Sequence, residues 1–80
     1  MPAARMIPVE STNVAEIGYA YVKRDLYVRY INTKDPNQPG KLYVYHKVPR
    51  SIFDNLRRAD SVGTYLNDYV KDFYQYELLG

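Results

Sequence analysis

The side chains that most often carry out chemistry are scarce in this sequence and do not form a set. The 80 residues include one histidine, His46, and no cysteine. Asp68 and Asp72 fall four residues apart, on the polar face of a predicted helix, with no base or nucleophile to complete a catalytic group. One histidine and scattered carboxylates are not a metal-ligand set, and the four glycines form no phosphate-binding loop. The sequence therefore predicts a protein that is not an enzyme and that has no metal or cofactor.

A second group of side chains is suited to binding rather than to reaction. The chain has ten tyrosines and no tryptophan. When a sheet binds single-stranded nucleic acid, aromatic rings stack on the bases and cations contact the phosphates. Six residues that interleave these two types are the predicted nucleic-acid site: Tyr27, Arg29, Lys41, Tyr43, Tyr45 and Lys47. If binding does not depend on them, Arg57 and Arg58 are the next candidates.

The charge of the chain is unevenly distributed although its formal net value is only +2. Residues 23–50 contain seven basic and two acidic side chains, whereas residues 60–80 contain four acidic side chains and one lysine. The predicted nucleic-acid site falls in the basic segment, which is the part of the chain that would attract a polyanion.

The elements that position these residues follow from two periodicities. Alternating apolar residues predict antiparallel strands near residues 15–22, 26–32 and 41–48, with a long loop over 32–40. Apolar residues at three- and four-residue steps predict helices near 49–59 and 61–73. The predicted fold class is α+β, with a three-stranded sheet followed by two helices on one of its faces. A short C-terminal strand near 74–78 is also predicted as possible, and residues 1–10 as an extended, mobile lead-in.

The third predicted strand can bury either of its faces. The pattern favours burial of Leu42 and Val44, which leaves Tyr43 and Tyr45 on the open side of the sheet. The opposite register stays possible because two tyrosines also make an apolar layer. Only the first register gives an exposed stacking surface. The residues predicted to form the core are Leu26, Val28, Ile52, Phe53, Leu56, Leu66, Tyr69 and Val70.

An ordered set of short motifs resembles the KTSC domain, which is named after the C-terminus of some lysyl-tRNA synthetases. The set consists of Ser11 ahead of Ile17-Gly18-Tyr19, Leu26-Tyr27-Val28, Tyr43-Val44-Tyr45, Val48-Pro49 and the segment from Ala59 to Asn67. It extends from about Met6 to Tyr76, which implies a single domain over residues 1–80. The loop at 32–40 is longer than is usual in the family, and Ala20 stands where an aspartate often follows the Gly-Tyr pair. The link to synthetases suggests RNA as a ligand by association.

The sequence as a whole predicts a non-catalytic binding module for RNA or another single-stranded nucleic acid. The alternative is a protein–protein adaptor, or a small regulatory or inhibitory protein that a virus could encode. No apolar run approaches the roughly 18 residues of a membrane span, so no membrane partner is expected. The absence of cysteine fits a reducing, cytoplasmic compartment.

Overall fold

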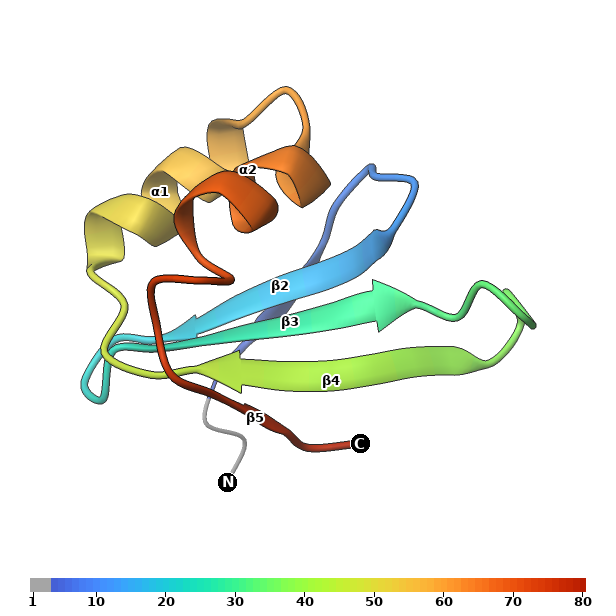
Figure 1. Cartoon of the computed structure of the whole chain (residues 1–80), viewed down its shortest axis with the longest axis horizontal. Coiled ribbons are helices and arrows are strands. Elements are labelled where there is room, and N and C mark those ends of the chain that lie inside the picture. The colour runs from blue at the N-terminus through green and yellow to red at the C-terminus, as the bar shows by residue number, and fades with distance from the viewer. Residues whose placement is uncertain (1–3) are drawn as a thin grey trace.

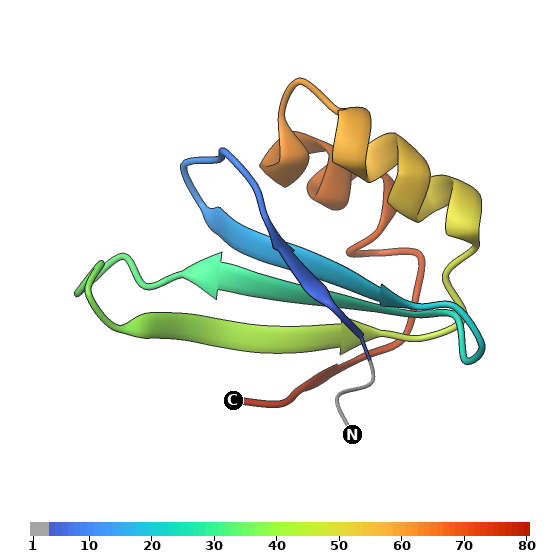
Figure 2. The same ribbon diagram turned by 180° about the vertical axis from the view of Figure 1, so that it is seen from behind.

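One antiparallel sheet and two helices make up residues 4–80, the part of the chain that the computed structural model describes (Figure 1). The strands are β1 (Met6–Pro8), β2 (Val14–Ala20), β3 (Asp25–Ile31), β4 (Pro39–Tyr45) and β5 (Tyr76–Leu78), and the helices are α1 (Arg50–Arg58) and α2 (Val62–Tyr69). The strands lie side by side in chain order, and both helices pack on the same side of the sheet (Figure 2). The α+β class and the helix pair are thus as predicted.

The sheet is larger than predicted because two short edge strands extend it. β1 pairs with β2 through Met6 opposite Gly18, so residues 6–8 of the predicted lead-in are extended as expected but form an edge strand of the sheet. Residues 1–3 of the lead-in lie outside the described residues. β5 returns after the helices to pair with β4, which confirms the C-terminal strand. A three-stranded sheet is therefore corrected to five strands in residues 4–80.

Two turns at one end of the molecule shorten the strands relative to the prediction. β2 stops at Ala20, whose carbonyl accepts a hydrogen bond from the Arg24 amide at 2.7 Å and closes a four-residue turn. β4 stops at Tyr45, and the predicted strand to residue 48 is broken by Lys47, which has a left-handed backbone with φ of 57°. Arg24 is left-handed as well, with φ of 60°. Neither residue type favours this region. The sequence predicts a connection between the first two strands at residues 23–25, whereas it gives no sign of the turn at Lys47.

The two helices begin where the sequence places them, and α2 ends early. Pro49 precedes α1 in an extended conformation, and the Ser61 side chain caps α2 by accepting a hydrogen bond from the Thr64 amide at 3.3 Å. α2 was predicted to run to residue 73 but ends at Tyr69. The amides of Val70 and Lys71 both donate to the Leu66 carbonyl, and the chain then turns down toward β5.

The core lies between the helices and the sheet and contains most of the residues predicted for it. Six of the eight are at most 2% exposed, namely Leu26, Val28, Phe53, Leu56, Leu66 and Val70. Ile52 is partly buried against them. The prediction that Tyr69 belongs to the core is wrong, since this residue is 54% exposed. The inward face of α2 runs through Val62, Leu66 and Val70, and Tyr69 instead packs on Tyr65 with ring centroids 4.7 Å apart.

The favoured register of the third predicted strand is also wrong. Tyr45 is opposite Leu26 and Tyr43 is opposite Val28. Since directly paired residues point to the same side of a sheet, both tyrosines share the helix-facing side with Leu26 and Val28. Tyr45 is only 2% exposed and belongs to the core.

Truncation of a buried leucine on α2 should unfold the domain far more readily than truncation of its exposed tyrosine. We expect Leu66→Ala to lower the free energy of unfolding by about 2–5 kcal/mol, because it leaves a cavity among side chains that are almost fully buried. Tyr69→Ala removes more atoms but should cost less than about 1 kcal/mol. Urea unfolding of both variants tests this, and equal losses would show that the inward face of α2 is misassigned.

Replacement of Lys47 by glycine should stabilise the fold. A left-handed backbone costs an L-residue such as Lys47 roughly 1–2 kcal/mol, and glycine avoids this cost. The gain is only partial, because glycine loses more chain entropy on folding. We expect Lys47→Gly to gain up to about 1 kcal/mol and raise Tm by about 4 °C. Lys34→Gly, which makes the same change at a position without positive φ, is the control and should not stabilise. A fall in Tm for Lys47→Gly would contradict this reading of the turn.

Candidate binding groove

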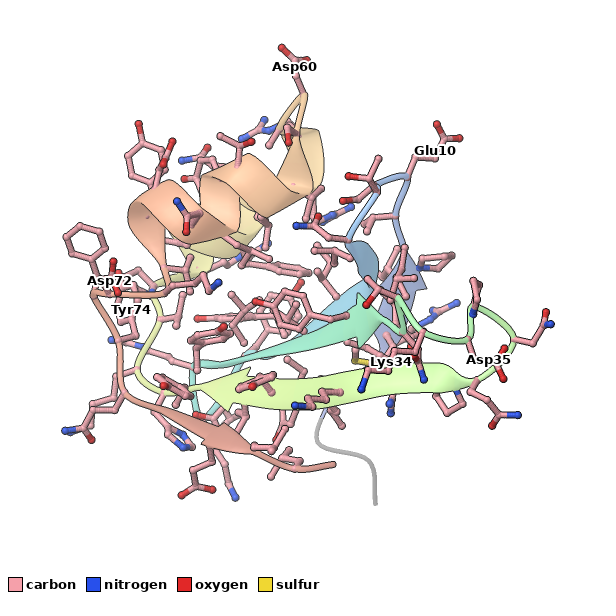
Figure 3. All side chains as sticks on the ribbon, turned by 45° about the vertical axis from the view of Figure 1, so that its right-hand side comes forward. Glu10, Lys34, Asp35, Asp60, Asp72 and Tyr74 are labelled. Carbon is pink, nitrogen blue, oxygen red and sulfur yellow. The ribbon has the colours of Figure 1, made fainter. Side chains whose placement is uncertain are left out.

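The helices leave part of the helix-facing side of the sheet uncovered, and a groove lies there. It has a volume of about 710 Å³ and is lined by residues of β3, β4, β5, the β3–β4 loop and the segment after α2. Figure 3 shows Lys34 and Asp35 on the loop toward one end, and Asp72 and Tyr74 on the chain between α2 and β5 toward the other. The groove therefore runs along β4, with the β3–β4 loop at one end and the segment between α2 and β5 at the other.

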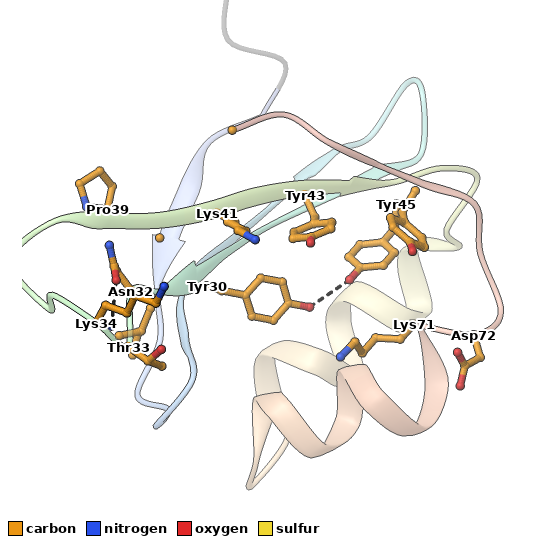
Figure 4. Close-up of a pocket in the computed structure, with 14 residues that line it drawn as sticks. Tyr30, Asn32, Thr33, Lys34, Pro39, Lys41, Tyr43, Tyr45, Lys71 and Asp72 are labelled. Carbon is orange, nitrogen blue, oxygen red and sulfur yellow. Dashed lines mark hydrogen bonds between the residues drawn. The ribbon is translucent and has the colours of Figure 1, made fainter.

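Four tyrosines from three strands line the groove and contact one another. They are Tyr30 on β3, Tyr43 and Tyr45 on β4, and Tyr76 on β5. The Tyr43 ring meets Tyr30 edge-on at 5.6 Å, and the Tyr76 ring is tilted against both Tyr43 and Tyr45 at 5.8 Å. The hydroxyls of Tyr30 and Tyr45 share a hydrogen bond of 2.9 Å (Figure 4). These contacts hold the rings in fixed positions before any ligand arrives.

The buried hydroxyls of this cluster stay neutral. Burial raises the pKa of Tyr45 well above its ordinary 10.0, and the hydrogen bond to Tyr30 raises it further. Burial also raises the pKa of Tyr30, against a smaller lowering from the hydrogen bond with Tyr45. Neither group can therefore serve as a base near neutral pH. The exposed part of the cluster is Tyr76, which is 57% exposed.

Cations stand on both sides of the tyrosines. Lys41 lies on the β4 side and Lys71 on the α2 side of the rings (Figure 4), and Lys34 comes from the loop at the end of the groove. Asp72 is the one acidic residue among those that line the groove in the described part of the chain. The groove thus combines aromatic rings with a surplus of positive charge, which suits an anionic ligand that carries flat rings.

The structure brings together only half of the predicted site. Lys41, Tyr43 and Tyr45 line the groove. Tyr27 and Arg29 face the opposite side of the sheet, because Tyr27 is paired with Val44 and Arg29 with Leu42. Arg29 is also occupied there, since its Nε lies 3.3 Å from Glu16 and its Nη1 donates to the Gly40 carbonyl at 2.9 Å. Lys47 lies in the turn after β4. The prediction that all six residues share the open face of the sheet is therefore wrong.

Four tyrosines and lysines that line the groove were not predicted from the sequence, namely Tyr30, Lys34, Lys71 and Tyr76, and for Tyr30 the signal was present. Tyr30 follows Leu26 and Val28 at steps of two along β3, so its side chain lies on the same face of the sheet as those two core residues. Tyr76 and Lys71 could not be placed without knowing that the chain returns along β4.

His46, the one histidine of the chain, lies between two carboxylates. His46 Nδ1 lies 3.1 Å from Asp25 Oδ1, and its Nε2 lies 3.8 Å from Glu77 Oε1. This contact links β3, the end of β4 and β5. Within residues 4–80, no three acidic or histidine side chains gather closely enough to hold a metal ion. The helices of that same segment are too short and too polar to cross a bilayer.

The fold and the groove define a class of two-layer α+β domain with a tyrosine-lined cleft, and the comparisons with known proteins specify the family. The family model described as KTSC domain matches residues 10–76, and the chain belongs to this family. A protein of Tsukamurella paurometabola is 35% identical over 66 residues, which cover 82% of this chain and 88% of the relative. The crystal structure of the KTSC domain protein YPO2434 from Yersinia pestis superposes with a TM-score of 0.84 at 26% identity, covering 98% of this chain and 100% of that one.

Alkaline pH should weaken the fold through Tyr45. The folded state keeps the Tyr45 proton to a higher pH than the unfolded chain does, so this contribution is fully present below pH 10.0 and is lost as the pH rises above it. Urea unfolding at about pH 8 and about pH 11 should show a smaller loss of stability for Tyr45→Phe than for the wild type. Tyr69→Phe is the exposed control and should keep the wild-type loss. Identical pH dependence in all three proteins would contradict the burial of this hydroxyl.

Proposed function

We propose that this KTSC domain is a non-catalytic module that binds single-stranded nucleic acid in the tyrosine-lined groove. The nucleic acid that we expect it to bind is RNA. The observation that supports the proposal is that four tyrosines and three lysines line one groove, with a single acidic side chain, Asp72, among them. Sequence-tolerant binders of single strands combine stacking rings with a cationic track along the backbone.

The groove has room for a segment of a strand and not for a duplex. Its volume of about 710 Å³ falls within the range of roughly 300–1,000 Å³ that is typical of small-ligand clefts. One or two unstacked bases can enter a cleft of this size and meet the half-exposed Tyr76 ring beside Tyr43. Lys41 and Lys71, on opposite sides of the rings, would then meet the phosphates that flank those bases.

The chemistry of the groove supports binding without turnover. Its two deepest hydroxyls bond to each other and are held neutral by burial, and they serve as donor and acceptor rather than as nucleophiles. A chain with no cysteine fits a reducing compartment, so cytoplasmic RNA is the ligand that we expect it to meet.

Titration of fluorescent single-stranded RNA at two salt concentrations tests this function. We expect Tyr76→Ala to weaken binding by about 1–3 kcal/mol, the value of stacking on one ring. Lys41→Ala or Lys71→Ala should each lower the slope of affinity against salt by about one. Tyr76 and both lysines are exposed, so these variants should fold normally.

Two matched controls locate the site. Tyr69→Ala removes a tyrosine of similar exposure that lies on α2 outside the groove, and Lys47→Ala removes a cation at the turn after β4. Both should keep wild-type affinity. No binding at low salt would end the nucleic-acid proposal and favour the alternative of a protein adaptor. Binding that Tyr76→Ala and Lys71→Ala leave unchanged would place the ligand elsewhere.

A further inference from the structure

The turn between β2 and β3 carries an apolar tip at one corner of the molecule (Figures 1 and 2). Val22 is 97% exposed, the most exposed of the large apolar side chains in the described residues, and its neighbour Tyr21 is 53% exposed. Neither side chain lines the groove, and Val22 has no place in the core cluster. The Tyr21 ring packs edge-on against the core rings of Tyr19 at 5.0 Å and Phe53 at 6.3 Å. An apolar side chain held fully in water at the apex of a turn does nothing for the packing of the domain.

Four cations surround this tip. Lys23 and Arg24 complete the same turn. Lys47 lies in the adjacent turn, which is held against the first by a 2.8 Å hydrogen bond from the Val48 amide to the Arg24 carbonyl. The Arg50 guanidinium lies 5.1 Å from the centre of the Tyr21 ring. These residues form a surface that we call the basic tip: Tyr21, Val22, Lys23, Arg24, Lys47 and Arg50.

Most of this positive charge is uncompensated. Of the four cations, only Arg50 forms an ion pair within residues 4–80, with Asp54 at 3.6 Å. The nearest acidic neighbour along the hairpin, Asp25, has a side chain that is only 14% exposed and that bonds to His46. The basic tip therefore presents free cations around an apolar apex.

Two of these cations occupy positions that do not suit their residue type. Arg24 and Lys47 both hold left-handed backbone, which glycine or asparagine adopts with less strain. Both side chains are exposed, so packing does not require a long side chain at either place. Strain that persists without a packing benefit is a feature of functional positions.

We propose that the basic tip docks on the surface of an anionic lipid bilayer. Cations near such a surface are attracted by its negative potential, and tyrosine favours the interface between headgroups and acyl chains. Val22 would enter that interface, with the core-packed Tyr21 ring at its edge, while Lys23, Arg24, Lys47 and Arg50 contact the headgroups. A nucleic-acid backbone would satisfy the same cations but would leave Val22 in water. This proposal departs from the expectation of no membrane partner, which rested on hydropathy along the sequence and therefore on spanning segments alone.

Cosedimentation with phosphatidylcholine vesicles, with and without phosphatidylserine, tests the proposal on the intact chain. We expect retention only by the vesicles that contain phosphatidylserine, and release by salt. Val22→Ser should weaken partitioning roughly tenfold through the lost apolar contact. Lys47→Gly should weaken it about fivefold while Tm rises, so lost binding cannot be ascribed to unfolding. Arg58→Gln, a charge change of the same size at the far end of α1, should have no effect.

The outcomes separate this proposal from the one on the groove. Tyr76→Ala should leave vesicle binding intact, and Val22→Ser should leave RNA binding intact. Absence of retention on anionic vesicles overturns the proposal, as does retention that Val22→Ser does not reduce. Duplex or single-stranded RNA that binds through Lys23 and Lys47, with vesicles failing to bind, would assign the basic tip to nucleic acid instead.

Discussion

The size of the two helices relative to the sheet is the constraint from which the rest of this structure follows. α1 has nine residues and α2 has eight, so each is about 12–14 Å long. The central strands have seven residues and are about 23 Å long, in a sheet that two edge strands widen further. Two such helices can cover β2, β3 and one end of β4, but not the remainder. The uncovered remainder is the groove, and its lining is aromatic because it continues the core.

Tyrosine is the residue that makes this partly covered face stable. Tyr45 is buried like any core side chain, yet its hydroxyl finds a partner in Tyr30 at the boundary of the core. Tyr43 and Tyr76 continue the same layer outward until the rings meet solvent. A leucine or phenylalanine layer in these positions would leave an apolar surface without polar groups. One residue type thus serves both as core and as the wall of a binding cleft.

The sequence predicted the parts of the fold that depend on long, regular patterns. The alternation of Leu26 and Val28 and the helical spacing of Phe53, Leu56 and Leu66 were sufficient to place three strands, two helices and most of the core. The register of β4 could not be decided, because both of its faces are apolar and only pairing with β3 resolves them. β1 and β5 have three residues each, too few to show a period, and they are strands because a neighbour supplies their hydrogen bonds. This register separates Lys41, Tyr43 and Tyr45 from Tyr27 and Arg29, whereas Lys47 is separated from them by the turn that ends β4.

The proposed function requires that single-stranded RNA enter the groove on the helix side of the sheet and not lie on its open back. Amide chemical shifts of the isotope-labelled domain, followed during titration with a short single-stranded RNA, distinguish these two surfaces. We predict that shifts are confined to the lining, above all Lys41, Tyr43, Lys71 and Tyr76, while Tyr27 and Arg29 on the back of the sheet stay unchanged. Shifts centred on that back face, or no shifts at low salt, would contradict it.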